Sequence, residues 1–509
     1  MNNALSQLQN GADIRGVATE GIIGEPVTLS ESVVSKIGVG FAAWLHQKQA
    51  KEQSQTLRIA IGTDTRLSGP TLAEALQKAL IRIGCDVMHC GVASTPAMMN
   101  STIYKELMAD GAIMLTGSHM TFNRNGMKFF TQGRDINADE LTEIIKLAEK
   151  EALPPKSNGN FHIVNIMSLY ARKLREKIIA ELQDLNEDDP THPLKGLKII
   201  VDAGNGAGNF FVSRVLKPLG ADTTGSQFLS ADGRFPNHSP NPEDYEAVKS
   251  ASNAVIHNDA DLGIIFDSDV DRAAIIDRGG KVINRNEFVA LAATLVQEEH
   301  PHTDIVTDSI TSTGLTTYVQ ETLGAHQCRY QRGYRNVIAE AIRKNNSGTE
   351  CWLAAETSGH AAFKENNFCD DGAYFAVKVI IRLAKLKREG KTISSLIERL
   401  PVPLESREYR IRICSPDFAR TAEETIRGLR QYVAQISDWE EVNQNHEGLR
   451  VMCKQENQKG WFLCRLSLHS PDLPINVEAD TEGGVKNIVN QLKLYFRNTR
   501  DIDSSSLYK

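Results

Sequence analysis

A strand-and-helix unit occurs three times along the chain and limits its possible architecture most strongly. Each copy joins a short β-branched strand, an Asp at its end, a Gly-containing turn, a short helix and a Gly that stops the helix. The strands lie at 57–64, 197–202 and 304–308. Such units ordinarily continue by a right-handed crossover to a parallel strand, and their spacing is too wide for a solenoid. We therefore predict three similar mixed-sheet α/β domains that present loops to ligands at their strand ends.

The last hundred residues follow a different pattern. Residues 405–414 alternate polar and apolar side chains, as a half-exposed strand does. We predict a smaller α+β domain here, with helices near 417–436 and 484–496 and further strands at 448–453, 460–467 and 474–480. A chain of 509 residues is too long for one core, and linker-like segments divide it into predicted domains at 1–160, 161–302, 303–400 and 401–509.

Composition limits the partners and the compartment. The net charge of -7 gives no reason to expect nucleic acid or an anionic membrane surface as a partner. The sequence has no apolar run of the ~20 residues that a membrane span needs, and residues 1–7 do not read as a secretory signal. We expect a cytoplasmic monomer or homodimer, or a stromal protein if a transit peptide has been removed. The eight cysteines show no C-x-x-C pair, which favours reduced, buried thiols.

A hydroxyl nucleophile stands beside an imidazole at Ser118-His119, directly after the apolar run 112–115. The ordinary alternative is a serine that caps a helix or a turn. No Gly-x-Ser-x-Gly motif surrounds it, which argues against an α/β-hydrolase. Asn125-Gly126 predicts a tight turn that returns Lys128 towards the serine.

Three carboxylates follow the apolar run 262–266 at alternate positions, Asp267, Asp269 and Asp271. A solvated loop is one explanation, and an EF-hand is another. The EF-hand is disfavoured because Arg272 stands where that loop needs glycine and its twelfth position lacks a glutamate. We predict a Mg²⁺ loop, beside which Arg272 holds either a phosphate or the nucleophile's oxygen by a charge-assisted hydrogen bond.

Two later loops carry groups suited to a phosphorylated sugar. The first follows the apolar run 351–354, where Glu356 and Ser358 suit vicinal sugar hydroxyls and His360 adds an imidazole, although an ordinary turn is the alternative. The second offers a guanidinium, hydroxyls and loop amides that together form a phosphate cradle. Its residues are Arg465, Ser467, His469 and Ser470.

Taken together and in order, these motifs resemble the α-D-phosphohexomutase superfamily of phosphomannomutases and phosphoglucomutases. The matching segments are 13–16, 62–68, 116–119, 267–272, 333–335, 356–360 and 465–471. The resemblance implies four domains around a central cleft and an isomerase that moves phosphate between positions 1 and 6 of glucose or mannose. It also implies a small sugar phosphate as the partner, Mg²⁺ as the metal and a hexose 1,6-bisphosphate as the activator.

The same resemblance assigns roles to individual residues. Ser118 is the phosphorylated residue and, with Asp267, Asp269 and Asp271, a ligand of the metal. The catalytic groups around the phosphate are Arg15, His119, Lys128, Arg272 and His360. The substrate-binding residues are Gly333, Tyr334, Arg335, Glu356, Ser358, Arg465, Ser467, His469 and Ser470.

The sequence departs from the family pattern without losing a charged or nucleophilic group. Met120-Thr121 replaces the usual Asn-Pro, Ser268 and Ala355 replace glycines, and Leu468-His469 replaces the common Gly-Thr or Asn-Thr. Three alternatives therefore stay open. They are a phosphoglucosamine mutase, a phosphatase that forms a phosphoserine, and a non-catalytic sugar-phosphate-binding relative.

Overall fold

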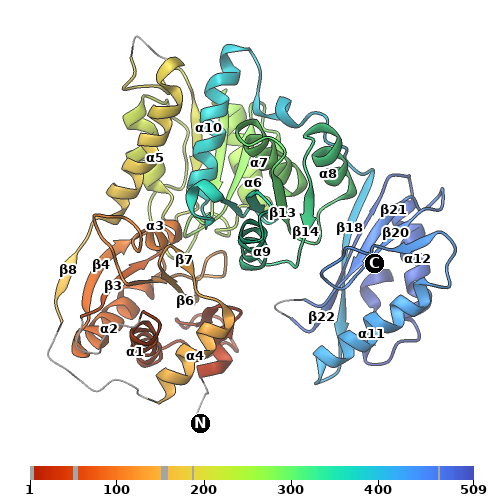
Figure 1. Cartoon of the computed structure of the whole chain (residues 1–509), viewed down its shortest axis with the longest axis horizontal. Coiled ribbons are helices and arrows are strands. Elements are labelled where there is room, and N and C mark those ends of the chain that lie inside the picture. Colours follow the sequence, from red (N-terminus) through yellow and green to blue (C-terminus); the bar gives the residue numbers. More distant parts are fainter. Residues whose placement is uncertain (1–4, 50–55, 151–158, 186–188, 468–469, 509) are drawn as a thin grey trace. The chain divides into compact units, whose positions relative to one another are not determined.

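The computed structural model describes residues 5–49, 56–150, 159–185, 189–467 and 470–508 (Figure 1). The chain forms two compact units. One contains Met1–Asn284 and Ser358–Leu396, and the other contains Arg285–Thr357 and Ile397–Lys509. We describe each unit on its own.

The first sheet of the first unit runs in the order β1-β2-β6-β5-β3-β4-β8, with β7 paired to β6. Its central strand β3 pairs in parallel with β4 and β5, as the predicted crossover units require. Strand β6 runs antiparallel between β2 and β5, and places Arg15 opposite Gly126 and Lys128 opposite Met114. The strands are β1 (Gln9–Asn10), β2 (Asp13–Val17), β3 (Arg58–Thr63), β4 (Asp86–Val92), β5 (Gly111–Leu115), β6 (Arg124–Thr131), β7 (Arg134–Asp135) and β8 (Phe161–Ile163).

Helices cover this sheet with apolar faces. Figure 1 shows α1, α2 and α4 together along one side of the strands, where Phe41 of α1 packs on Phe129 of β6 with ring centroids 5.0 Å apart. Helix α4 begins with a capping box in which Asn137 and Glu140 satisfy each other's backbone amides. The helices are α1 (Glu31–Lys48), α2 (Gly69–Arg82), α3 (Thr95–Asn100) and α4 (Ala138–Glu149).

The second sheet of this unit has the order β12-β11-β10-β9. Strands β9 and β10 are parallel, whereas β10 and β11 are antiparallel and joined by the carboxylate loop 267–272. Helix α10 packs on α5 and on β11. The elements are α5 (Ile166–Leu182), β9 (Ile199–Asp202), α6 (Tyr245–His257), β10 (Leu262–Phe266), β11 (Ala273–Asp277), β12 (Val282–Ile283), the hairpin of β16 (Ala361–Phe363) and β17 (Cys369–Asp370), and α10 (Gly372–Arg388).

The second unit begins with parallel strands, in which β13 lies between β14 and β15. Helix α9 contacts both β13 and β15 and starts directly after Gly333, whose φ of 111° a larger residue would adopt only with strain. The elements are α7 (Arg285–Glu299), β13 (Asp304–Thr307), α8 (Thr313–Thr317), β14 (Gln327–Arg329), α9 (Tyr334–Asn346) and β15 (Cys351–Ala355).

The C-terminal part of the second unit is an antiparallel sheet in the order β19-β20-β21-β22-β18-β23. Two amphipathic helices bury their apolar residues in one core with the strands. The elements are β18 (Glu405–Ile413), α11 (Phe418–Val433), β19 (Trp439–Glu441), β20 (Leu449–Cys453), β21 (Gly460–Cys464), β22 (Asp472–Ala479), α12 (Gly484–Phe496) and β23 (Ile502–Asp503).

The predicted fold class is confirmed, because the chain contains three α/β domains and a further β-rich C-terminal domain. All eight cysteines are free and most are buried, although Cys414 is exposed. Among the described helices, none has the length and apolar composition needed to cross a bilayer. The turn predicted at Asn125-Gly126 is wrong, because both residues lie inside β6, where pairing with β2 outweighs their turn propensity.

Candidate active site

The loop that joins β5 to β6 holds Ser118, the predicted nucleophile, in a strained conformation. Ser118 has φ of 49°, a left-handed value that is uncommon for a residue with a Cβ atom. Its N–H donates to Thr116 Oγ1 at 2.8 Å, which fixes the turn locally. Backbone strain of this kind is frequent at functional sites, where the surrounding structure enforces it.

A buried arginine from the end of β3 holds this loop. The Arg66 guanidinium donates to the carbonyl oxygens of Ser118, Met120, Thr121 and Arg124 at 2.5–2.9 Å. Its Nε donates to Asp64 Oδ2 at 3.0 Å. A Cβ atom at residue 117 would come within 2.5 Å of the guanidinium carbon, so only glycine fits there. The loop conformation thus depends on Arg66 more than on the loop's own residues.

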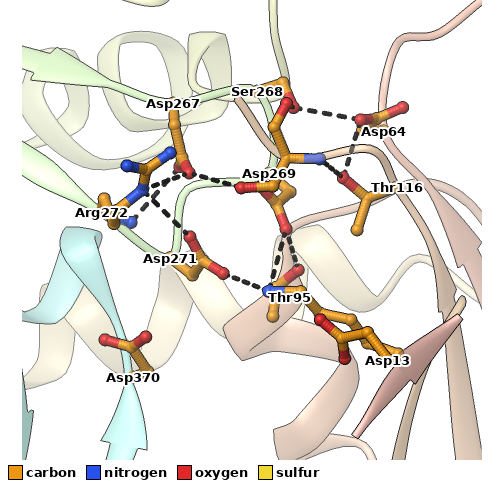
Figure 2. A network of polar contacts seen from close by, with 12 residues as sticks. Asp13, Asp64, Thr95, Thr116, Asp267, Ser268, Asp269, Asp271, Arg272 and Asp370 are labelled. Carbon is orange, nitrogen blue, oxygen red and sulfur yellow. Dashed lines mark hydrogen bonds and ion pairs between the residues drawn. The ribbon is translucent and has the colours of Figure 1, made fainter. Parts of the chain in front are cut away.

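The three predicted metal ligands converge on the β10–β11 loop. Asp267, Asp269 and Asp271 are all buried, and each offers a carboxylate oxygen within 4.8 Å of the others (Figure 2). The backbone of Val270 adopts φ of 64°, which is exceptional for a β-branched side chain and bends the loop between the acids. Thr95 of α3 donates from its Oγ1 to Asp269 Oδ2 at 2.5 Å and fixes that carboxylate.

Two buried cations partly neutralise these carboxylates. The Lys128 ammonium pairs with Asp271 and lies 3.6 Å from Asp269 Oδ2, while Arg272 Nε donates to Asp267 Oδ2 at 3.1 Å. Burial and the two neighbouring carboxylates raise the pKa of Asp267 well above its usual value. Burial acts to raise the pKa of Asp271, but Lys128, His360 and Arg272, with a hydrogen bond from Asp267, together outweigh it and lower that pKa. The three carboxyl groups of the loop thus outnumber the two cations paired with them.

The donor set fits a divalent cation. Asp269 Oδ1 and Asp271 Oδ1 are buried and have no hydrogen-bond partner among the described residues. A buried carboxylate oxygen without a partner is costly, and a hard cation such as Mg²⁺ would satisfy oxygen atoms of this kind. The alternative of a solvated loop is thereby excluded, because none of the three acids is exposed.

The nucleophile and the carboxylate loop meet directly. Ser118 Oγ donates to Asp267 Oδ2 at 3.2 Å and lies 3.4 Å from Nδ1 of His119. The positive charge of Arg272 and then burial lower the pKa of His119 to about 2, so this imidazole is neutral. Arg15 on β2 donates to the carbonyl of Thr116, which brings a further cation to the nucleophile loop.

His360 also lies in the first unit, where it pairs with a buried carboxylate. Its Nδ1 forms an ion pair with Asp370 on β17, and both residues lie within reach of Asp271. Figure 2 shows the Asp370 carboxylate on the neighbouring ribbon below Asp271. This contact fixes the orientation of the His360 ring. Ser358, two residues before it, is buried in the same segment.

The second unit contains the other predicted substrate residues of the third domain. Glu356 Oε1 accepts a hydrogen bond from the backbone N–H of Gly333 at 2.6 Å, which joins the two predicted sugar-binding segments. The Arg335 guanidinium lies 4.6 Å from the ring centroid of Tyr334, so each restrains the other. Buried Asp308 supports this region by accepting from the Thr357 hydroxyl at 2.7 Å.

The predicted phosphate cradle lies after β21 in the same unit. Arg465 is buried, and its Nη1 donates to Leu466 O at 3.3 Å. Ser470 Oγ donates to Asp472 Oδ2 at 2.6 Å and lies 3.0 Å from Ser467 Oγ, which brings the two hydroxyls together. His469, also predicted to bind substrate, lies outside the described residues.

Sequence reasoning missed several residues that shape this site. Asp64 and Arg66 lie in the family-like segment 62–68, but the resemblance implies no role for them, and Thr95 and Asp370 have no signal in the sequence. For Arg66 a signal did exist, because a charged pair directly after a buried strand is unusual without a partner. Thr95 and Asp370 act on Asp269 and His360 from 174 and 10 residues away, so only the fold reveals them.

Replacing Arg66 with lysine will destabilise the first unit. The ammonium has three donors on one atom and cannot serve acceptors spread over the loop, so buried carbonyls lose their partners. We expect the free energy of unfolding to fall by roughly 2–4 kcal/mol, from two or three lost hydrogen bonds. Urea denaturation measures this change. The matched control is Arg134→Lys, which alters an exposed bidentate pair with Glu140, and equal effects of the two variants would contradict the prediction.

Comparison with known proteins places this geometry in a family. Residues 6–154, 176–280 and 284–403 match domains I, II and III of the phosphoglucomutase/phosphomannomutase alpha/beta/alpha family. A phosphomannomutase/phosphoglucomutase of Pseudomonas aeruginosa is 29% identical over 450 residues, which are 88% of each chain. A phosphoglucosamine mutase of Alkaliphilus oremlandii is 31% identical over 353 residues, covering 68% of this chain and 73% of that protein.

Solved structures agree with the sequence comparisons. The crystal structure of a phosphoglucomutase/phosphomannomutase family protein from Burkholderia thailandensis superposes with a TM-score of 0.77 at 26% identity, and the match covers 96% of this chain and 97% of that one. The three domain matches and the full-length structural match therefore indicate the same family. The chain belongs to the phosphoglucomutase/phosphomannomutase family.

Proposed function

We propose that this protein is a phosphohexomutase that interconverts hexose 1-phosphate and hexose 6-phosphate. In this proposal Ser118 carries the phosphoryl group, and a hexose 1,6-bisphosphate is the intermediate. The observation that supports it most is the hydrogen bond from Ser118 to Asp267, because it joins a strained nucleophile to a buried carboxylate cluster. A serine that only capped a turn would need neither the cluster nor the cations beside it.

The chemistry requires that charge on the transferred group be neutralised while a proton moves. A bound Mg²⁺, held by Asp267, Asp269, Asp271 and the phosphorylated Ser118, would act as a Lewis acid on the phosphoryl oxygens. Arg15 and Arg272 supply positive charge around the nucleophile, as positioning and electrostatics dominate phosphoryl transfer.

We assign the proton transfer to His360. When the sugar hydroxyl oxygen bonds to phosphorus, the bond from phosphorus to Ser118 Oγ breaks and the hydroxyl proton passes to a base. His360 can take it on Nε2, because Nδ1 is already held by Asp370. In the second transfer Ser118 Oγ bonds to phosphorus, the bond from phosphorus to the sugar oxygen breaks, and that oxygen takes the proton back from His360 Nε2.

Substrate recognition falls to the second unit together with Ser358. Glu356 and Ser358 suit neighbouring sugar hydroxyls in either orientation of the ring, and Glu356 accepts from the backbone N–H of Gly333, which directly precedes Tyr334 and Arg335. Arg465, Ser467 and Ser470 would bind the phosphate that is not being transferred.

One observation favours a second substrate class, the glucosamine phosphates. The 31% identity to a phosphoglucosamine mutase exceeds that to the Pseudomonas phosphomannomutase/phosphoglucomutase, although it covers less of the chain. We propose glucose and mannose phosphates as the substrates because the Pseudomonas match spans more of both proteins. Turnover of glucose, mannose and glucosamine phosphates, compared at equal concentration, separates these classes.

The deciding experiment is the intact mass of the protein after incubation with glucose 1,6-bisphosphate and Mg²⁺. A mutase gains one phosphoryl group on Ser118 and loses it again when hexose monophosphate is added, which yields bisphosphate. A phosphatase releases inorganic phosphate to water without any acceptor sugar. A non-catalytic relative gains no mass, and either of these outcomes would contradict the proposal.

A further inference from the structure

The guanidinium of Arg465 is only partly satisfied by the protein. Its side chain is 3% exposed, and Nε is buried without a hydrogen-bond partner among the described residues. Burial lowers the pKa of Arg465, and the positive charge of Arg332 lowers it further. A buried donor beside a second guanidinium attracts an anion, so the surroundings of Arg465 favour phosphate binding.

A carboxylate of the protein already lies beside this position. Glu447 Oε1 is 4.0 Å from Arg465 Nη1. Its Oε2 accepts hydrogen bonds from the Ser309 hydroxyl and, at 3.2 Å, from the backbone N–H of Arg332. The side chain of Glu447 is only 13% exposed, so solvent screens its charge weakly.

The backbone holds Glu447 firmly in this place. Asn445 Nδ2 donates to the carbonyl oxygens of Glu447 and Gly448 at 2.8 and 3.1 Å. Gly448 has φ of 60°, and a Cβ atom there would lie 2.1 Å from the carbonyl oxygen of Cys464. Because Cys464 directly precedes Arg465, this close approach fixes the Glu447 carboxylate next to Arg465.

We propose that Glu447 is a built-in competing anion that weakens the binding of phosphate to Arg465. The inference rests on the proposed function, in which the bisphosphate must leave the phosphate site at Arg465, the clamp, and reverse its orientation between the two transfers. A fixed negative charge beside the clamp repels a phosphate dianion and also pairs with Arg465 when the phosphate departs. Release is thereby accelerated at the expense of affinity.

The test is Glu447→Gln, because the amide oxygen still accepts from Ser309 and Arg332 while the charge is lost. Calorimetry with glucose 1-phosphate and glucose 6-phosphate gives Kd, and steady-state assays give kcat and KM. We expect roughly three- to tenfold tighter binding of both isomers, in the range of a partly screened charge pair. We also expect kcat to fall, because the tighter clamp slows reorientation.

Three further variants make the outcome decisive. Glu441→Gln removes a carboxylate from the same domain, where it pairs with Arg430, and should leave Kd unchanged. Ser309→Ala removes a hydrogen bond from Glu447 but keeps its charge, so it should not tighten binding. If Glu447→Gln fails to fold, Glu447→Ser removes the same charge with a shorter side chain and must also tighten binding.

The failure of this inference and that of the proposed function give different results. If the wild-type protein shows no mutase turnover and Arg465→Ala binds glucose phosphates as well as wild type, the proposed function and the clamp are both wrong. If wild type turns over and Arg465→Ala weakens binding, but loss of the Glu447 charge leaves binding equal or weaker, only the role of Glu447 is overturned.

Discussion

Ser118→Ala will abolish mutase turnover, with kcat reduced by at least about a thousandfold, while the protein stays folded. Removing a covalent nucleophile leaves only the binding and electrostatic parts of catalysis, and losses of this size are typical. Folding should survive because the Ser118 hydroxyl contributes one 3.2 Å hydrogen bond to Asp267, and the loop is held by Arg66 through backbone carbonyls. The measurements are the coupled mutase assay and the melting temperature.

The matched control is Ser101→Ala, at another buried serine of the first domain. Its hydroxyl donates to the Met98 carbonyl at 2.6 Å and has no part in the proposed chemistry. It should retain mutase turnover, and it should not lose the ability to accept a phosphoryl group from glucose 1,6-bisphosphate. Residual turnover in Ser118→Ala equal to that of Ser101→Ala, from protein free of contaminating mutase, would refute the phosphoserine mechanism.

The parts of the site that are local in sequence could be predicted. Asp267, Asp269 and Asp271 share one loop, so their spacing and the preceding apolar run were enough to indicate a cation site. The strand-end positions of Ser118 and Glu356 followed in the same way from the apolar runs 112–115 and 351–354 directly before them. Such residues can be located from the sequence because each lies directly after the apolar run that identifies its strand.

Lys128 was placed near the site for the wrong reason. Asn125-Gly126 has strong turn propensity, yet both residues lie in a strand that is paired on each side. Backbone pairing across a sheet of this size outweighs a local preference. Lys128 lies near the site because β6 runs antiparallel to β5. There it contacts Asp269 and Asp271 of the β10–β11 loop.

The remaining contacts are long-range and leave little trace in the sequence. Arg66 holds carbonyl oxygens 52–58 residues further along the chain, and Glu447 accepts from Ser309 across 138 residues. Neither an arginine after a strand nor a glutamate in a loop reveals its partner by pattern. Such residues become evident only when sheet order and register are known.

Lys128→Met will destabilise the first unit strongly and make its stability depend on Mg²⁺. Lys128 is 2% exposed and pairs with Asp271, with Asp269 3.6 Å away. Its loss leaves Arg272, which pairs with Asp267 and Asp271 but not with Asp269, and removal of one partner from a buried ion pair costs roughly 3–5 kcal/mol. A divalent cation bound to the same carboxylates compensates the missing charge, so Mg²⁺ should stabilise this variant more than wild type.

Urea denaturation with and without Mg²⁺, after treatment with a chelator, measures both effects. The control is Lys378→Met, which removes another buried ammonium from the same unit, one paired with Glu365 at 2.6 Å and not with the metal loop. That variant should lose stability without gaining a larger Mg²⁺ response. Lys128→Arg retains the positive charge and should resemble wild type more closely in its response.

The comparison is decisive because it does not depend on catalysis. If Asp269 and Asp271 bind Mg²⁺, the ion and Lys128 neutralise the same two carboxylates, and removing one must increase the effect of the other. Two unrelated sites would give additive effects instead. An equal Mg²⁺ response in wild type, Lys128→Met and Lys378→Met would therefore show that the buried acids of the β10–β11 loop are not the metal site.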